Sequence, residues 1–288
     1  MIGCRGMGAF SRGLVIAWCV AGMIGSAAAD PSRTRSLVRN GDATIEVVAE
    51  GSGRLIVMLP SRGRDSSDFD AAAAALAADG FRVLRPQPRG IGGSVGPSET
   101  LTLHDYAGDI AAVITAEHDG PAVIVGHAFG NWVARMTAVD HPALVRGVVL
   151  AAAAAKVYPP GLSAVVGKVG DPALPESERR MYLQQAFFAP GHDPSSWLAG
   201  WYPAVNRSQN AASERTRQAE WWSGGKAPLL DLQAADDPFK PAASRNELKD
   251  EFGSRVTLVV IPDASHALFP EQPKAAAEAI AKWAQALP

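Results

Sequence analysis

The chain has 288 residues, with 27 lysines and arginines against 29 aspartates and glutamates, and a formal net charge of −2. This balance, together with the lack of any basic run in the sequence, argues against nucleic acid as a partner. The sequence shows no metal-ligand spacing of histidines and acids and no glycine-rich phosphate loop, so neither a metal nor a cofactor is expected. Hydrophobic residues make up 47% of the chain, which suits one large domain with its own core.

Residues 1–29 have the pattern of a secretory signal peptide. Arg5 and Arg12 give a positive region, residues 14–24 form an apolar core, and three alanines ending at Ala29 supply an A-x-A cleavage site. We expect cleavage after Ala29 and export to the periplasm or the medium. No stable membrane anchor is expected after cleavage.

Two other interpretations of this leader compete with cleavage. A retained membrane anchor is one, although the apolar core is shorter than the ~20 residues that a span needs. A lipoprotein anchored at Cys19 is the other, and it is disfavoured because the bulky Trp18 stands where a small residue is required. Both cysteines of the chain, Cys4 and Cys19, lie in the leader, so residues 30–288 can form no disulfide.

Apolar, β-branched runs alternate with helical patterns along the rest of the chain. This alternation predicts an α/β fold with a mostly parallel central sheet and helices on both faces. The predicted strands are 44–48, 55–59, 81–84, 122–125, 147–151, 228–232 and 256–261, and the predicted helices are 68–78, 102–118, 132–139 and 273–287.

About seventy residues, roughly 156–226, lack strand character and interrupt this alternation. Helical patterns near 176–188 and 212–222 predict a small helical cap inserted into the domain. One or two of its tryptophans are predicted to line a substrate pocket, and the others to fasten the cap to the sheet domain. The four tryptophans are Trp197, Trp201, Trp221 and Trp222.

The segment 121–135, PAVIVGHAFGNWVAR, is built like a nucleophile elbow. A buried strand, a sharp turn between Gly126 and Gly130, and a helix form the context in which G-x-S-x-G carries a catalytic serine. The central position is Ala128, and a methyl group cannot attack a carbonyl. The sequence leaves open whether this alanine is natural or engineered.

Two further loops carry residues of catalytic type. Asp237 follows the predicted strand 228–232, and His266 follows the predicted strand 256–261. An acid after one late strand and a histidine after the next match the chain order nucleophile, acid, histidine. An aspartate that contacts the imidazole would orient it and fix its tautomer.

The elbow GHAFG, the acid loop DDPFKP and the histidine loop SHALFPEQP together resemble the α/β-hydrolase fold superfamily, over nearly all of residues 42–288. The resemblance implies that Asp237, four residues before Pro241, is the family acid rather than its neighbour Asp236. It also implies that His266 is the family base. Alanine at the elbow departs from the family pattern.

The same resemblance assigns roles near the elbow. It implies that the backbone amides of Arg62 and Phe129 form an oxyanion hole; the alternative is that both loops are merely tight turns. The Arg62 side chain could clamp a substrate carboxylate or point into water. Ser61, at a strand end that faces the pocket, is a candidate substrate contact and the nearest substitute nucleophile. His127 is expected to pack to the side.

Three hypotheses of function remain. The first is an enzyme that acts on a small, largely apolar carbonyl compound, such as an ester or lactone, by general-base catalysis from His266 and Asp237. The second is a degenerate hydrolase that binds a small ligand, against which the retained dyad argues. The third is a serine esterase whose nucleophile was changed to Ala128. The partner is a small-molecule substrate in the first case, and the sequence does not indicate an oligomeric state.

Overall fold

The structure, a computed structural model, describes residue 1 and residues 33–118 and 120–288. Residues 2–29 of the predicted signal peptide lie outside the described residues. No helix of the described part of the chain is both long and apolar enough to cross a membrane.

The central sheet has eight strands in the order β1-β2-β4-β3-β5-β6-β7-β8. β1 pairs antiparallel with β2, β2 pairs antiparallel with β4, and every other neighbouring pair is parallel. The predicted α/β class with a mostly parallel sheet is therefore confirmed. The strands are β1 (Thr34–Asn40), β2 (Ala43–Gly51), β3 (Arg54–Leu59), β4 (Phe81–Pro86), β5 (Ala122–His127), β6 (Val145–Ala151), β7 (Leu229–Ala234) and β8 (Val256–Ile261).

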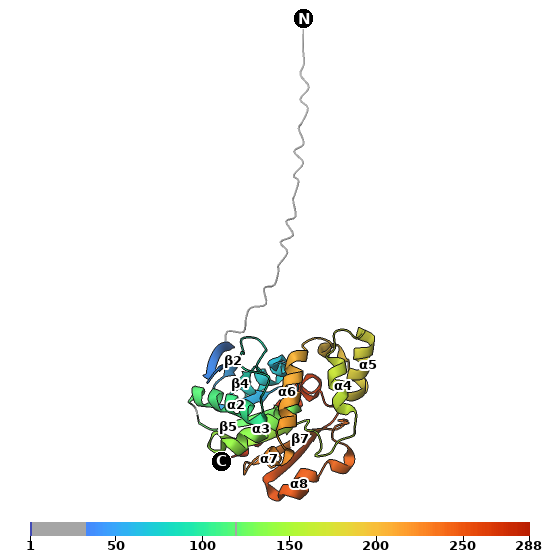
Figure 1. Ribbon diagram of the computed structural model, residues 1–288. Coiled ribbons are helices and arrows are strands. Elements are labelled where there is room, and N and C mark those ends of the chain that lie inside the picture. Colours follow the sequence, from blue (N-terminus) through green and yellow to red (C-terminus); the bar gives the residue numbers. More distant parts are fainter. Residues whose placement is uncertain (2–32, 119) are drawn as a thin grey trace. The chain divides into compact units, whose positions relative to one another are not determined.

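Helices cover both faces of this sheet (Figure 1). α2 and α3 pack together over one face, and α1 and α10 pack together over the other. Side chains of the central strands alternate between the two resulting cores, which is why stretches such as 56–59 and 122–125 are apolar on both faces. The helices are α1 (Asp70–Ala78), α2 (Leu103–Glu117), α3 (Phe129–Asp140), α4 (Leu162–Val169), α5 (Glu176–Ala186), α6 (Pro203–Arg215), α7 (Gln218–Trp221), α8 (Glu247–Phe252), α9 (Leu268–Glu271) and α10 (Pro273–Ala286).

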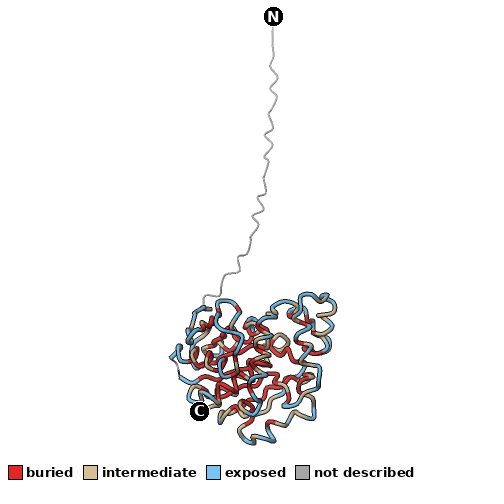
Figure 2. The backbone as a smooth tube through the Cα atoms, in the orientation of Figure 1, coloured by how far each residue is buried: buried red, intermediate tan, exposed pale blue. Residues whose placement is uncertain are grey.

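The central strands are the most deeply buried part of the domain. Figure 2 shows the buried backbone gathered in the middle of the molecule, with exposed segments around it. In β5 every residue is buried, and the side chains of Val123 and Val125 face one core while Ile124 faces the other. The catalytic-type loops start from the ends of these rigid strands, so the core fixes their positions.

Helices α4 to α7 lie between β6 and β7, in the segment where the sequence predicts a helical cap. We call this segment, residues 156–226, the helical insertion. α4 and α5 pack side by side at one end of the domain (Figure 1). Apolar side chains of α4 and α5 form a core with Phe239 and Ala267, which belong to the acid and histidine loops. The insertion therefore packs directly against both loops.

Some predicted boundaries are wrong. The predicted helix 212–222 is interrupted, because α6 ends at Arg215 and α7 begins at Gln218. The buried Thr216 separates them: its hydroxyl accepts a hydrogen bond from the Leu103 amide and donates one to the Ala212 carbonyl. This contact with α2 holds the backbone of Thr216 in an extended conformation.

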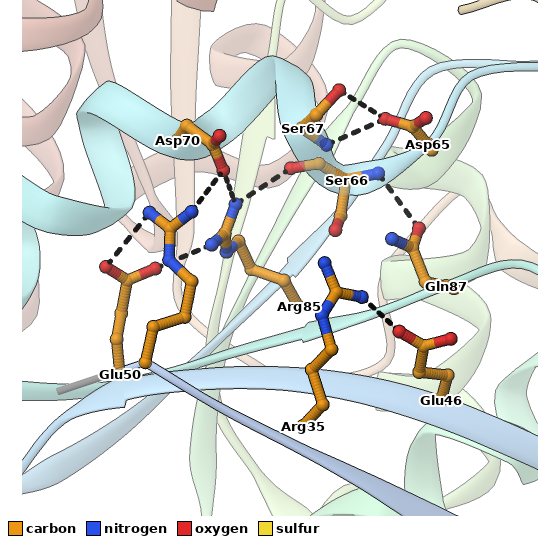
Figure 3. Close-up of polar contacts among 10 residues, drawn as sticks. Arg35, Glu46, Glu50, Asp65, Ser66, Ser67, Asp70, Arg85 and Gln87 are labelled. Atoms are coloured by element: carbon orange, nitrogen blue, oxygen red, sulfur yellow. Dashed lines mark hydrogen bonds and ion pairs between the residues drawn. The ribbon is translucent and has the colours of Figure 1, made fainter. Parts of the chain in front are cut away.

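A polar network fixes the loop that follows β3, on which Ser61 and Arg62 lie. The buried Arg85 of β4 bonds Glu50 of β2 at 2.7 Å, the Ser66 carbonyl at 3.1 Å, and Asp70 at the start of α1 (Figure 3). Gln87, which directly follows β4, accepts the Ser66 amide at 3.0 Å. This bond connects the loop after β3 to the loop that follows β4.

Candidate active site

The turn between β5 and α3 has the geometry of a nucleophile elbow. Ala128 has φ 48° and ψ −114°, a backbone conformation that L-residues rarely adopt. A Cβ on Gly130 would lie 2.2 Å from the Leu59 carbonyl oxygen, and a Cβ on Gly126 would lie 2.4 Å from the backbone of Asn131. Both positions therefore require glycine, as the G-x-x-x-G spacing of the turn predicts.

His266 and Asp237 form a buried pair. The His266 Nδ1 lies 2.9 Å from the Asp237 Oδ2, and the other carboxylate oxygen of Asp237 accepts the Phe239 amide at 2.8 Å. The exposed fractions of Asp237 and His266 are 3% and 5%, whereas Asp236 is exposed. The predicted contact of His266 with Asp237 rather than Asp236 is therefore present. It leaves Nε2 as the ring nitrogen available for chemistry.

A cleft joins the elbow to this pair. It encloses about 460 Å³ including its open mouth, and it is mainly apolar. The predicted residues Ser61, Arg62, Ala128, Phe129 and His266 all line it. The remaining lining residues, which the sequence analysis did not identify, are Trp132, Ala154, Tyr158, Ser163, Val166, Phe187 and Phe239.

Two of the unpredicted lining residues had a usable signal. Phe239 stands two residues after Asp237, and its ring lies 4.2 Å from the His266 ring between centroids. Trp132 stands one helical turn after Phe129 on α3, so both face the cleft at i,i+3 spacing. Ser163 and Val166 of α4, and Phe187 directly after α5, could not be placed from sequence, because only the packing of the insertion brings them to the cleft.

The backbone amides of Arg62 and Phe129 are free to receive a ligand oxygen. Phe129 is the first residue of α3, where an amide has no partner within its own helix. In the described part of the chain, neither amide donates a hydrogen bond to another protein group. Both residues line the cleft together with Ala128. Two unbonded backbone amides at one cleft are a requirement of the predicted oxyanion hole.

None of the four tryptophans predicted as pocket candidates lines this cleft. The fully buried Trp197 lies 5.6 Å from Trp201 between ring centroids, and the guanidinium of Arg64 lies 4.6 Å from one ring and 4.8 Å from the other. Arg64 also bonds Asp68 and the Ala199 carbonyl. These two tryptophans thus fasten the insertion to the loop after β3.

The second pair of tryptophans also has a packing role. Trp221 stacks on Trp132 with centroids 5.1 Å apart, and so supports a cleft wall from behind. Trp222 donates to Glu251 at 2.8 Å and packs against the guanidinium of Arg135 at 4.5 Å. The prediction that one or two of the four line the pocket is wrong, because each is already engaged in joining the insertion to the sheet domain.

The histidine loop is held by an acid that the sequence analysis did not identify. Glu271 of α9 accepts the Ser265 amide at 2.7 Å and the Ala189 amide at 2.6 Å. Burial raises the pKa of this carboxyl, and the two amides act in the opposite direction. Glu271 thus connects the residue before His266 to the helical insertion.

His127 packs beside the dyad, and its side chain holds the main chain of His266 in place. It is fully buried, and its Nε2 donates to the His266 carbonyl at 2.7 Å. Burial and the neighbouring His266 lower the pKa of His127 from 6.5 to about 3. His127 is therefore neutral at physiological pH, and its ring lies among Phe69, Phe269 and Trp197 as a packed side chain.

We expect His127 to make the fold sensitive to acid. Because the unfolded chain binds this proton near pH 6.5 and the folded chain only near pH 3, stability falls as pH drops through that window, by up to roughly 1.4 kcal/mol per pH unit. Urea unfolding measured across that pH range should show that the free energy of unfolding falls less steeply for His127→Gln than for the parent. Glutamine keeps a donor toward His266 but does not titrate. If the free energy of unfolding falls equally steeply with pH in the parent and in His127→Gln, His127 is not the source of the acid sensitivity.

The elbow after β5, the acid after β7 and the histidine after β8 define an α/β-hydrolase site in which alanine occupies the nucleophile position. The family model described as "Alpha/beta hydrolase family" matches residues 56–279. The chain belongs to the alpha/beta hydrolase family.

Known proteins similar to this chain are consistent with that family. A pyrethroid hydrolase of Sphingobium wenxiniae is 26% identical over 236 residues, covering 76% of this chain and 83% of that protein. A 2-(acetamidomethylene)succinate hydrolase of Mesorhizobium japonicum is 34% identical over 109 residues, which are 38% of this chain and only 39% of that protein. The solved structure of a hydrolase from Pseudomonas aeruginosa has a TM-score of 0.72 at 23% identity, covering 88% of this chain and 98% of that one, a likeness of fold.

Proposed function

We propose that the protein is an enzyme that adds water to a small, largely apolar carbonyl compound, such as an ester or lactone, without an acyl-enzyme. The observation that carries this proposal is the buried His266–Asp237 pair beside an alanine elbow. A protein that only binds a ligand gains nothing from an oriented imidazole whose Nε2 faces a cleft. The similarity to proteins named as hydrolases supports the same class of reaction.

In the proposed reaction, Nε2 of His266 removes a proton from a water molecule above the Ala128 methyl group. The resulting hydroxide adds to the carbonyl carbon, and the Arg62 and Phe129 amides stabilise the oxyanion. The oxyanion then collapses and breaks the bond to the leaving oxygen, which receives the proton back from His266. Asp237 holds Nδ1 and stabilises the imidazolium between these two steps.

The expected rate enhancements from general-base catalysis and oxyanion stabilisation make this route feasible. General-base help is worth ~10²–10⁴-fold, and one oxyanion donor contributes ~10²–10³-fold. Together they allow a modest but real enzyme. A screen of esters, lactones, β-diketones and hydroxynitriles tests the proposal, with a serine-directed phosphonate as a second probe. Turnover without phosphonate labelling is the expected result, and labelling of a residue in the cleft would replace this mechanism with a covalent one.

A ligand-binding protein is the second candidate, and the alanine at position 128 is the observation that favours it. Ala128 has none of the nucleophilic groups that the family's covalent route requires. In that case the cleft would hold a small ligand between Trp132 and Phe187 without converting it. Saturable binding of a screened compound, with no product formed over long incubation, would support this candidate over the enzyme.

We also propose that residues 1–29 are a leader removed after Ala29, from the charge, apolar and A-x-A pattern. Protein isolated from its native host should begin at Asp30 when its intact mass is measured. A mass that still includes Met1 would contradict the proposal. The outcome also decides whether the two cysteines of the chain, Cys4 and Cys19, remain in the functional protein.

A further inference from the structure

Arg62 contributes more than a backbone amide to the cleft. Its side chain neither points into water nor is held by an acid: it lies partly buried between α4 and α6 of the helical insertion. Nη1 donates to the Asn210 Oδ1 at 2.7 Å, and Nη2 donates to the Ser163 Oγ at 3.1 Å and to the Ser163 carbonyl at 3.4 Å. All three acceptors are neutral.

These bonds leave the guanidinium with spare capacity. The group has five N–H donors, and these three acceptors engage at most three of them. Within residues 33–118 and 120–288, no carboxylate forms an ion pair with it. The acid that acts on it from a distance is Glu214, whose carboxylate already accepts the Asn210 Nδ2 at 2.7 Å. At least two N–H groups are therefore free for a ligand.

A guanidinium in this position is costly unless an anion accompanies it. Burial lowers the pKa of Arg62, with Tyr158 and Glu214 offsetting part of the shift. Arginine nevertheless remains protonated at physiological pH, so a partly desolvated positive charge persists at the cleft without a bonded counter-charge. Such a charge is stabilised most by an anion, because a charge-assisted hydrogen bond is stronger than one to a neutral acceptor.

The other groups around the cleft fit a ligand with an anion at one end. Among the described residues that line it there is no aspartate or glutamate, and the basic side chains there are those of Arg62 and His266. The walls between them are aromatic, formed by Trp132, Phe187 and Phe239. Arg62 also lines a second, open cleft with Arg207 and Glu214, so an anion bound at Arg62 stays close to solvent.

We propose that the substrate carries a carboxylate that binds the Arg62 guanidinium at the insertion end of the cleft, with its reacting carbonyl beside His266. This inference rests on the proposed function, since it names the substrate class of the same site. An apolar chain would connect the two ends of the molecule along the aromatic walls.

Calorimetric titration with a matched pair of compounds tests this proposal. Monomethyl adipate presents a carboxylate and an ester, and dimethyl adipate is its neutral counterpart. Titration into a His266→Ala background involves no turnover, so the result does not depend on whether the dyad catalyses hydrolysis. We expect the monoester to bind about 10- to 100-fold more tightly than the diester, the range of a charge-assisted hydrogen-bonded pair.

Two further variants in the His266→Ala background separate the effect of the Arg62 charge from that of packing in the helical insertion. Arg62→Gln should abolish the preference for the monoester and leave binding of the diester nearly unchanged. Asn210→Ala removes a neighbour of Arg62 in the insertion but keeps the guanidinium, so the preference should persist. Equal affinities for the two compounds, no binding of either at millimolar concentration, or loss of the preference in Asn210→Ala would each overturn the proposal.

Discussion

Replacing His266 with alanine should reduce turnover of the true substrate by ~10²–10⁴-fold, the usual value of general-base help. The reason is geometric: Asp237 holds Nδ1 at 2.9 Å, and the opposite ring nitrogen is the basic atom directed at the cleft. The variant should fold, because the side chain is replaced by a smaller one at the edge of a cavity. Steady-state rates on compounds found in the screen provide the measurement.

The control is a histidine that also contacts an acid but lies away from the cleft. His104 of α2 pairs with Asp140 at 2.7 Å and is not a lining residue. His104→Ala should therefore leave turnover close to that of the parent. Asp237→Asn should lower the rate in the same direction as His266→Ala, because it loses the carboxylate that stabilises the imidazolium. If His266→Ala works at the parent rate, the dyad is not the catalyst.

Replacing Ala128 with serine should create a covalent route that the parent lacks. The backbone at this position already has the elbow conformation, with φ 48°, so a hydroxyl there would project into the cleft that contains His266. An activated ester should then give an initial burst of product approaching one equivalent per chain. A serine-directed phosphonate should label the variant, and intact mass would register the adduct.

The matched control for this gain is the double variant Ala128→Ser/His266→Ala. Without the imidazole the new hydroxyl has no base to activate it, so both the burst and the labelling should disappear. If Ala128→Ser folds but gives no burst of product and does not react with the phosphonate, the elbow and the dyad are out of alignment. In that case the oxyanion hole would also need another location.

The candidate catalytic residues at the strand ends could be predicted from sequence, because each of them directly follows a strand of strong apolar character. Asp237 and His266 follow β7 and β8, and the glycines around Ala128 signal the tight turn after β5. β1 gave no such signal: it is an edge strand with mostly exposed residues, so neither apolar runs nor alternation indicate it. Its pairing with β2 is decided by tertiary structure.

The cleft walls were less predictable, for a different physical reason. Aromatic composition identified four tryptophans of the insertion, but an indole packs equally well against a ligand or against another helix. Which outcome occurs depends on partners distant in sequence, such as Arg64 for Trp197 and Trp132 for Trp221. The lining residues Ser163 and Val166 lie on α4, a helix that the sequence pattern did not reveal.

The backbone at Ala128 has a consequence for which substitutions this position tolerates. A residue at φ 48° costs about 1–3 kcal/mol of folding free energy, and the chain bears that cost without a nucleophile to use it. What the conformation does provide is the direction of the Phe129 amide. Sequence drift at position 128 is therefore limited by the main chain rather than by side-chain chemistry. Small residues such as glycine, serine and cysteine can replace alanine there, whereas β-branched residues would disturb the amide that the proposed reaction needs.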